Sequence, residues 1–244
     1  MSDASAAVSF GDSAVDYDRV RPVVAPGSLE WLLEGTTPEH VLDLGAGTGA
    51  LSRILRGASH HVTAVDPDER MLAVLRDHNP EAVAIVGAAE SIPLSDAGVD
   101  AVLVSSAWHW FDQRRAPYEI ARVLRTGGRL GTVGTLLDPQ VPWVADLYDR
   151  LIVRAGRPLP WELPAAPAEG PFTEAERTEF SWSVNASAGE IVELVATWSA
   201  VARAATDTRA DLLRWVEHVV RDAVGNGPAL APYRSYCARC DRTD

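Results

Sequence analysis

The sequence predicts an α/β protein whose doubly wound, mostly parallel sheet carries helices on both faces. Short apolar runs alternate with segments of helical periodicity across residues 41–133, which is typical of strands joined by right-handed helical crossovers. A glycine-rich turn at residues 45–49 joins the first run to the first helix. The 244 residues are enough for one such domain and a modest cap, so we predict a single domain over residues 1–244.

The first half of the chain supplies five strands and the helices between them. Ser28 is suited to cap a short helix that ends at Leu33, and Asp68 to cap the helix that carries Met71, Leu72 and Leu75. A helix over residues 114–125 ends at two glycines, 127 and 128, which suit a C-terminal cap. The strands are expected at residues 41–44, 61–65, 82–86, 99–105 and 129–133.

The pattern changes after residue 133. A helix is expected over residues 142–154, followed by a proline-rich stretch, and we interpret residues 134–172 as a cap over the ligand edge of the sheet. Residues 10–35 are interpreted as an N-terminal lid. The remaining elements, which complete the sheet within residues 180–240, are strands at 180–184 and 232–240 and helices at 191–204 and 209–224.

Composition narrows the class of partner. The formal net charge of −12 argues against binding to nucleic acid or to an anionic membrane. No apolar stretch approaches the ~18 residues of a membrane span, and no signal peptide is visible, so we expect a cytoplasmic protein. All 22 basic residues are Arg, which suggests a GC-rich bacterial genome. Cys237 and Cys240, three apart on a predicted strand, should point to opposite faces as incidental thiols, and no metal-ligand set is visible.

Four segments that each follow a strand should meet at the carboxyl edge of the sheet, where open α/β sheets bind ligands. They begin at Gly45, Asp66, Glu90 and Ser105. Glycines let backbone N–H groups approach a ligand closely, and the following helix directs its positive dipole end at the same place. The Asp66 carboxylate can accept two hydrogen bonds from the vicinal hydroxyls of a ribose; alternatively, it caps the turn before Pro67.

Two nucleotide cofactors are compatible with this turn. Gly45 and Gly47, followed by Ala50, satisfy the looser dinucleotide fingerprint of NAD-dependent oxidoreductases. Asp43 favours the other reading, because its carboxylate would face a pyrophosphate unfavourably but suits the ammonium or sulfonium group of S-adenosylmethionine. Gly49 completes a Gly-x-Gly-x-Gly spacing that favours the same cofactor.

Residues 43–49 resemble the first motif of class I S-adenosylmethionine-dependent methyltransferases. Residues 87–94, 99–102 and 124–130 resemble, in order and spacing, the later motifs of the small-molecule members. The resemblance implies a Rossmann-like sheet of seven strands with the last one antiparallel. Ala88 departs from the usual Asp, so the adenine contact is expected from Ala89 or Glu90. The cofactor contacts implied for the core are Asp43, Gly45, Ala46, Gly47, Gly49, Asp66, Pro67, Ala89, Glu90 and Ser105.

The segment after the fourth strand is expected to face the substrate. Trp108 and Trp110 can wall an apolar pocket and offer π-faces to a sulfonium cation. His109, the one histidine predicted at the ligand edge, could act as a general base. In the alternative interpretation, the histidine forms a local hydrogen bond and the tryptophans are packing residues.

The N-terminal lid resembles that of a subgroup that includes trans-aconitate and farnesoic acid methyltransferases. Tyr17, Arg19 and Arg21 carry this resemblance. It implies that Tyr17 and Arg21 contact the cofactor and that Tyr17 and Arg19 contact the substrate, since Arg can bind a carboxylate in a bidentate pair. Trp143, in the predicted cap, is a further substrate-binding candidate.

The predicted function is methyl transfer from S-adenosylmethionine to an oxygen or nitrogen atom of a small molecule, by in-line displacement. A carboxylate acceptor would need no general base, whereas an amine or hydroxyl would. The alternatives are an NAD-dependent oxidoreductase and a non-catalytic ligand-binding protein on the same fold. The sequence does not identify the acceptor or the oligomeric state.

Overall fold

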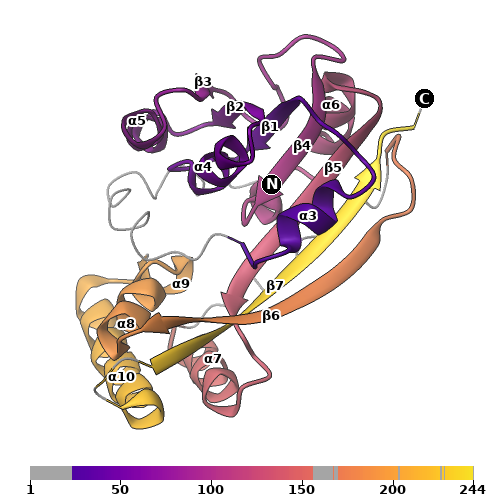
Figure 1. The fold of residues 1–244 in the computed structure, drawn as a ribbon. Coiled ribbons are helices and arrows are strands. Elements are labelled where there is room, and N and C mark those ends of the chain that lie inside the picture. The colour runs from indigo at the N-terminus through magenta and orange to yellow at the C-terminus, as the bar shows by residue number, and fades with distance from the viewer. Residues whose placement is uncertain are drawn as a thin grey trace.

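A seven-stranded sheet with the order β3-β2-β1-β4-β5-β7-β6 forms the centre of the protein (Figure 1). This computed structural model describes residues 24–155, 167, 170–202, 204–225, 227 and 229–243. Strands β1 to β5 run parallel, and β7 is antiparallel to both β5 and β6, which confirms the predicted sheet. The strands are β1 (His40–Leu44), β2 (His61–Asp66), β3 (Val83–Val86), β4 (Val99–Ser105), β5 (Leu124–Leu137), β6 (Glu176–Ala186) and β7 (Ala229–Asp241).

Helices cover both faces of the parallel part. Alternate residues of a strand point to opposite faces, so Val41 packs with α4 (Ala50–Gly57), whereas Leu42 belongs to the cluster that contains Ile120 of α6 (Ala116–Val123). Helices α3 (Ser28–Leu33) and α5 (Glu69–His78) lie on the α4 face. The glycine turn follows the carboxyl end of β1 and so lies at the edge of the sheet between the α4 layer and the α6 layer.

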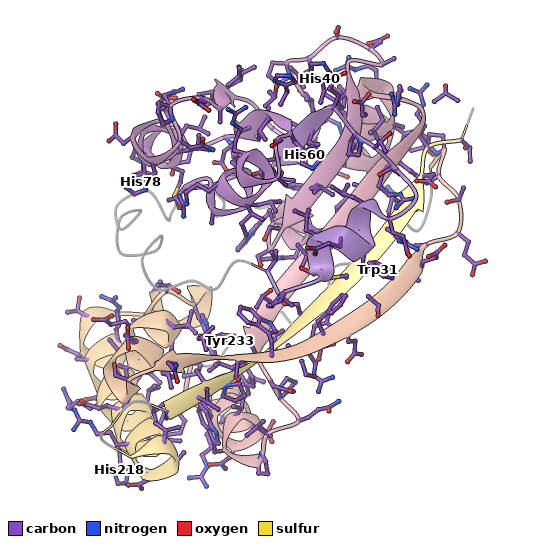
Figure 2. All side chains as sticks on the ribbon, in the orientation of Figure 1. Trp31, His40, His60, His78, His218 and Tyr233 are labelled. Carbon is purple, nitrogen blue, oxygen red and sulfur yellow. The ribbon has the colours of Figure 1, made fainter. Side chains whose placement is uncertain are left out.

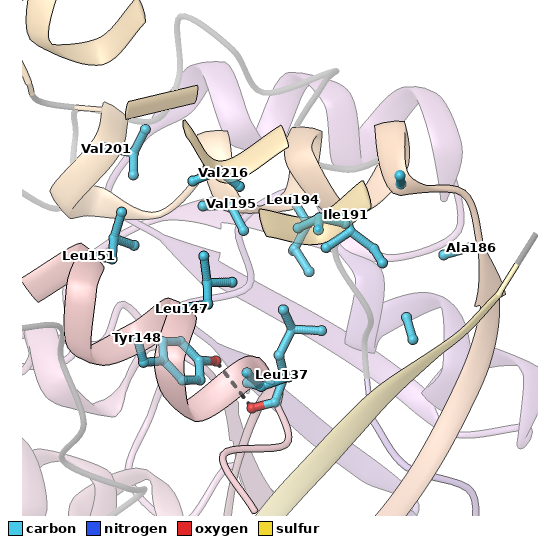
Figure 3. Close-up of a cluster of buried hydrophobic side chains, with 14 of the residues drawn as sticks. Leu137, Leu147, Tyr148, Leu151, Ala186, Ile191, Leu194, Val195, Val201 and Val216 are labelled. Carbon is cyan, nitrogen blue, oxygen red and sulfur yellow. Dashed lines mark hydrogen bonds between the residues drawn. The ribbon is translucent and has the colours of Figure 1, made fainter. Parts of the chain in front are cut away.

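The remaining helices form a separate lobe beyond the carboxyl end of β5 (Figures 1 and 3). They are α7 (Pro142–Ala155), α8 (Ala188–Ala196), α9 (Ser199–Ala202) and α10 (Thr206–Val224). One buried apolar cluster joins α7, α8 and α10, and the Tyr148 hydroxyl donates to the Leu137 carbonyl oxygen at 3.1 Å. Helix α7, which was predicted to lie in a cap of residues 134–172, thus packs with helices from far later in the chain. The prediction of a single helix over residues 191–204 is wrong, because Thr197 and Trp198 separate α8 from α9.

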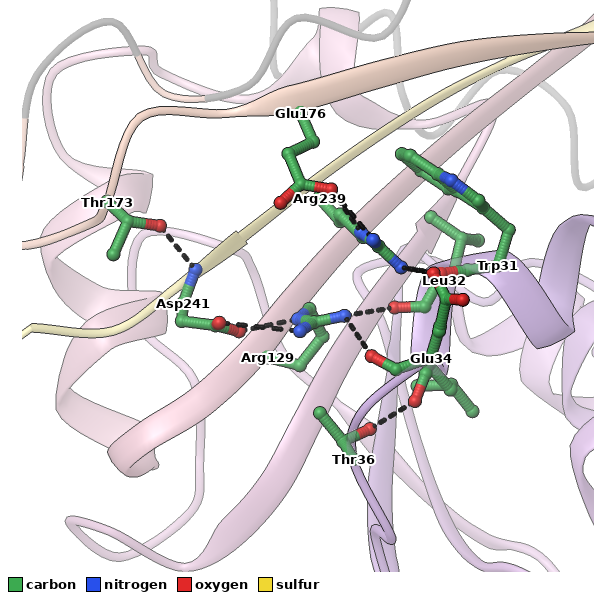
Figure 4. A network of polar contacts seen from close by, with 10 residues as sticks. Trp31, Leu32, Glu34, Thr36, Arg129, Thr173, Glu176, Arg239 and Asp241 are labelled. Carbon is green, nitrogen blue, oxygen red and sulfur yellow. Dashed lines mark hydrogen bonds and ion pairs between the residues drawn. The ribbon is translucent and has the colours of Figure 1, made fainter.

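Helix α3 is fastened to the sheet by two arginines (Figure 4). Arg129 of β5 donates to the carbonyl oxygens of Leu32 and Glu34, at 2.8 and 3.2 Å, and pairs with Asp241 of β7. Arg239 of β7 stacks over the Trp31 ring at 4.3 Å and forms ion pairs with Glu34 and Glu176. The first described helix is therefore attached to β5 and β7, two strands that come much later in the chain.

Of the three helix caps predicted from the sequence, one is confirmed and two are wrong. Asp68 caps α5 as predicted, accepting from the Arg70 N–H. Ser28 is not a cap, because its hydroxyl donates backward to the Ala25 carbonyl oxygen and the helix begins after Gly27. The cap at residues 127–128 is also wrong: β5 begins at Leu124, and the Gly127 N–H donates to the Arg242 carbonyl oxygen in the pairing of β5 with the chain after β7.

Both cysteines are buried in β7 and form no disulfide. Cys237 packs on the α3 and α4 face and Cys240 on the α6 face, as the strand periodicity predicted. Burial raises the pKa of each thiol to about 12. Among the described residues, no group of three or more His, Cys, Asp or Glu side chains could hold a metal ion, and no described helix is long and apolar enough to cross a membrane.

Candidate functional site

The three glycines of the turn after β1 all have positive φ, but for different reasons. A Cβ atom on Gly45 would lie 2.6 Å from the Ala107 Cβ, and one on Gly49 would lie 2.5 Å from the Leu75 Cγ. A Cβ on Gly47, where φ is +55°, would meet no atom of the described residues within 4 Å. Gly45 and Gly49 therefore allow the protein to pack against itself, and Gly47 is the residue whose open surface can receive a ligand.

Asp66, at the end of β2, is held beside this open surface by the backbone. The Gly47 N–H donates to Oδ2 and the Asp68 N–H to Oδ1, each at 2.9 Å. Burial raises the pKa of Asp66, and these two hydrogen bonds oppose the rise. Each carboxylate oxygen has a further lone pair, so the two oxygens can also accept from a pair of ribose hydroxyls. Pro67, which follows, is exposed.

Asp43 lies under the turn on the α4 side and is 1% exposed. The Ser52 hydroxyl donates to its Oδ2 at 2.6 Å, whereas its Oδ1 is buried and has no hydrogen-bond partner in the part of the chain that the structure describes. Burial raises the pKa of Asp43 to about 7, against the opposing effect of the Ser52 hydrogen bond. A buried acceptor without a donor is the kind of group that a nearby cation stabilises, so Asp43, Gly47 and Asp66 together fit a cationic nucleoside.

The loop after β3 contributes Ala89 and Glu90. The Ala89 side chain is buried among residues of the α6 face. The Glu90 Oε1 accepts a hydrogen bond from the Asp112 N–H at 2.7 Å. This contact, which the sequence analysis did not predict, joins the loop after β3 to the segment after β4.

The segment after β4 places its aromatic residues in two directions. Trp108 begins a short 3-10 helix, η2 (Trp108–Trp110), and is 4% exposed in the α6-side cluster; its Nε1 has no partner among the described residues. His109 is exposed and lies against Trp110, with ring centroids 4.6 Å apart. A role for Trp108 in an acceptor pocket stays a prediction, and its burial fits the packing interpretation.

Phe111 is a site residue that the sequence analysis did not single out. Its ring comes within 3.4 Å of the position that a Gly45 Cβ would occupy, and it also contacts Trp108, with ring centroids 5.8 Å apart. Ser106, the first residue after β4, adopts a φ of +54° and donates its N–H to the Val133 carbonyl oxygen at 2.7 Å. The chain thus turns sharply after Ser105 and returns over the glycine turn.

The structure brings together most, but not all, of the predicted site. His109 is the one histidine at the carboxyl edge: His40 and His61 begin β1 and β2, His60 precedes β2, and Figure 2 shows His78 and His218 on α5 and α10. Trp143 is half-buried against the cluster of the helical lobe. Three predicted lid residues, Tyr17, Arg19 and Arg21, lie outside the described residues.

The chain is similar to known proteins over most of its length. Residues 42–132 match the family model described as a methyltransferase domain. An uncharacterized methyltransferase of Mycobacterium tuberculosis is 40% identical over 235 residues, which are 95% of each chain. A malonyl-[acyl-carrier protein] O-methyltransferase of Methylococcus capsulatus is 41% identical over 152 residues, covering 57% of this chain and 55% of the relative. A solved structure from Anaeromyxobacter dehalogenans, provisionally described as a type II methyltransferase, has a TM-score of 0.70 and 30% identity and covers 91% of this chain and 97% of that one.

Proposed function

The chain belongs to the class I S-adenosylmethionine-dependent methyltransferases, and from this premise we propose that it methylates an oxygen or nitrogen atom of a small molecule by in-line displacement. One observation supports this most strongly: the open surface of Gly47 lies beside Asp66 and on the same edge of the sheet as His109. The net charge of −12 favours a small-molecule acceptor over nucleic acid.

The cofactor-binding residues have separate tasks in this proposal. Asp66 holds the ribose hydroxyls, and Gly47 lets the backbone approach. Asp43 balances the positive charge of the methionine part, and Ala89 lies beside the adenine. When bound, S-adenosylmethionine supplies a methyl group on a cationic sulfur that leaves as a neutral thioether. The contribution of the chain is to hold donor and acceptor in line and to exclude water, and such positioning can supply on the order of 7 kcal/mol or more. Further proposed cofactor contacts are Gly45, Ala46, Gly49, Pro67, Ser105, Tyr17 and Arg21.

The acceptor is proposed to lie against the exposed His109 and the half-buried Trp110 of η2. His109 would take the proton from an amine or hydroxyl acceptor, whereas a carboxylate acceptor would need no base. The Methylococcus relative, an O-methyltransferase by name, favours oxygen over nitrogen. Tyr17, Arg19, Trp108 and Trp143 are proposed as further acceptor contacts.

A panel of small carboxylic acids, amines and phenols, assayed with methyl-labelled S-adenosylmethionine, tests the proposal. We expect transfer to at least one class, and we expect His109→Ala to reduce transfer to amines and phenols but not to carboxylic acids. His218→Ala is the control, because His218 is exposed on α10. Tight cofactor binding without turnover on any acceptor would favour a non-catalytic protein, and saturable binding of NADH without S-adenosylmethionine binding would favour an oxidoreductase.

A further inference from the structure

Asp112 is held from two sides at the end of the segment that faces the proposed acceptor site. Its N–H donates to the Glu90 Oε1 at 2.7 Å. Its own Oδ1 accepts from the N–H groups of Arg114 and Arg115, at 2.9 and 3.2 Å, just before α6 begins. Asp112 therefore links the loop after β3, the segment after β4 and the start of α6.

The residue before Asp112 touches the glycine turn. Phe111 lies over Gly45, and Ala107, at the other end of the segment, lies against the same glycine. A shift of the Asp112 backbone would therefore move Phe111 along the turn, together with His109 and Trp110, which stand between the two contacts. The hydrogen bond between Glu90 and Asp112 therefore joins the loop after β3 to the backbone that carries the acceptor-facing side chains.

We propose that Glu90 is a positioning residue that couples the cofactor-binding loop after β3 to the acceptor-facing segment, residues 105–112. The inference rests on the proposed function and deepens it, because it gives Glu90 a task other than an adenine contact. A half-buried carboxylate that accepts from a backbone N–H forms a strong, charge-assisted hydrogen bond. Glutamine can still accept through its amide oxygen, whereas alanine cannot.

The first test needs no substrate. Amide hydrogen exchange of the ligand-free protein, followed by mass spectrometry, should be faster over residues 105–112 in Glu90→Ala than in the wild type, and near the wild type in Glu90→Gln. Exchange over residues 99–104 of β4 should not change. Glu119→Ala is the matched control, since the Glu119 Oε1 accepts from the Ile92 N–H at 2.8 Å and so ties the same loop to α6 and not to the acceptor-facing segment.

The second test separates positioning from cofactor binding. In Glu90→Ala we expect the acceptor KM to rise about tenfold, which corresponds to the loss of one hydrogen bond to a charged group. The Kd for S-adenosylhomocysteine should change much less, and Glu90→Gln should restore the acceptor KM. Glu119→Ala should leave the acceptor KM unchanged.

The outcomes are distinct. Unchanged exchange over residues 105–112 in Glu90→Ala would overturn the proposal, as would a weakened Kd for S-adenosylhomocysteine with an unchanged acceptor KM, which would make Glu90 a cofactor contact. If no acceptor is methylated by the wild type, the proposed function fails, and the exchange experiment alone still decides whether Glu90 holds the segment.

Discussion

Alanine at Gly47 should separate ligand binding from stability. The backbone at Gly47 has a φ of +55°, and within the part of the chain that the structure describes an added Cβ would meet no atom within 4 Å. The substitution should therefore cost the ligand-free protein only the strain of a left-handed alanine, about 1–2 kcal/mol. The new methyl group would occupy the open surface that the cofactor must approach. An extra methyl in a packed contact costs about 1–3 kcal/mol, so the Kd should rise about 5-fold to 150-fold.

Gly35→Ala is the matched control for this prediction. Gly35 has a φ of +76°, and an added Cβ there would also have no described residue within 4 Å, but Gly35 follows α3 and lies away from the carboxyl edge of the sheet. Both variants should lose similar stability in thermal unfolding without ligand. Isothermal titration with S-adenosylhomocysteine should then find weakened binding in Gly47→Ala alone. Equal Kd values for the two variants would refute the assignment of Gly47 as the ligand-approach residue.

Three further predictions concern stability. Gly45→Ala should destabilise the ligand-free protein by more than Gly47→Ala in thermal unfolding, because its Cβ would lie 2.6 Å from Ala107; equal losses would contradict this. The pKa of Asp43 is raised from 3.8 to about 7, so its contribution to stability is full below pH 4 and is lost as the pH rises through 7. Urea unfolding should show Asp43→Asn to be more stable relative to the wild type at pH 8 than at pH 5, and an unchanged difference would count against the raised pKa. Arg129→Met should lower the free energy of unfolding by about 1–3 kcal/mol in the same assay, because it removes the donor to the carbonyl oxygens of Leu32 and Glu34. Arg214→Met, at an exposed ion pair, should lower it by less than about 1 kcal/mol. Similar losses in the two variants would show that α3 is not held by Arg129.

The parallel half of the fold could be predicted because its central strands β1 and β4 are mostly buried and apolar residues predominate in β1 to β4. β1, β2, β3 and β4 each match their predicted ranges to within one residue. The later strands exceed their predicted ranges, since polar residues such as Glu176 and Glu179 mask the signal of β6. The additional residues of β6 and of the carboxyl end of β5 pair with β7, a non-local contact that no local pattern reports.

In the site, too, local patterns predicted some features, whereas others depend on residues that are distant in the sequence. Motif spacing indicated the glycine turn and Asp66, but it could not show which glycine leaves an open surface, because that depends on Ala107 and Leu75. It also could not show that Phe111 packs over the turn. The sequence offered one signal, an aromatic residue three positions after Trp108. This signal indicates packing over the glycine turn only when one knows that the chain returns over that turn after Ser105.

The two buried thiols of β7 provide a reporter of how the sheet opens. The chain has two cysteines, and each is shielded from solvent on a different face of a strand that lies between β5 and β6. Because a thiol with a pKa near 12 scarcely ionises at neutral pH, an alkylating reagent should react only after the strand is exposed. Equal labelling rates at Cys237 and Cys240 would indicate that both layers separate from the sheet in one cooperative event, and unequal rates would identify the layer that detaches first.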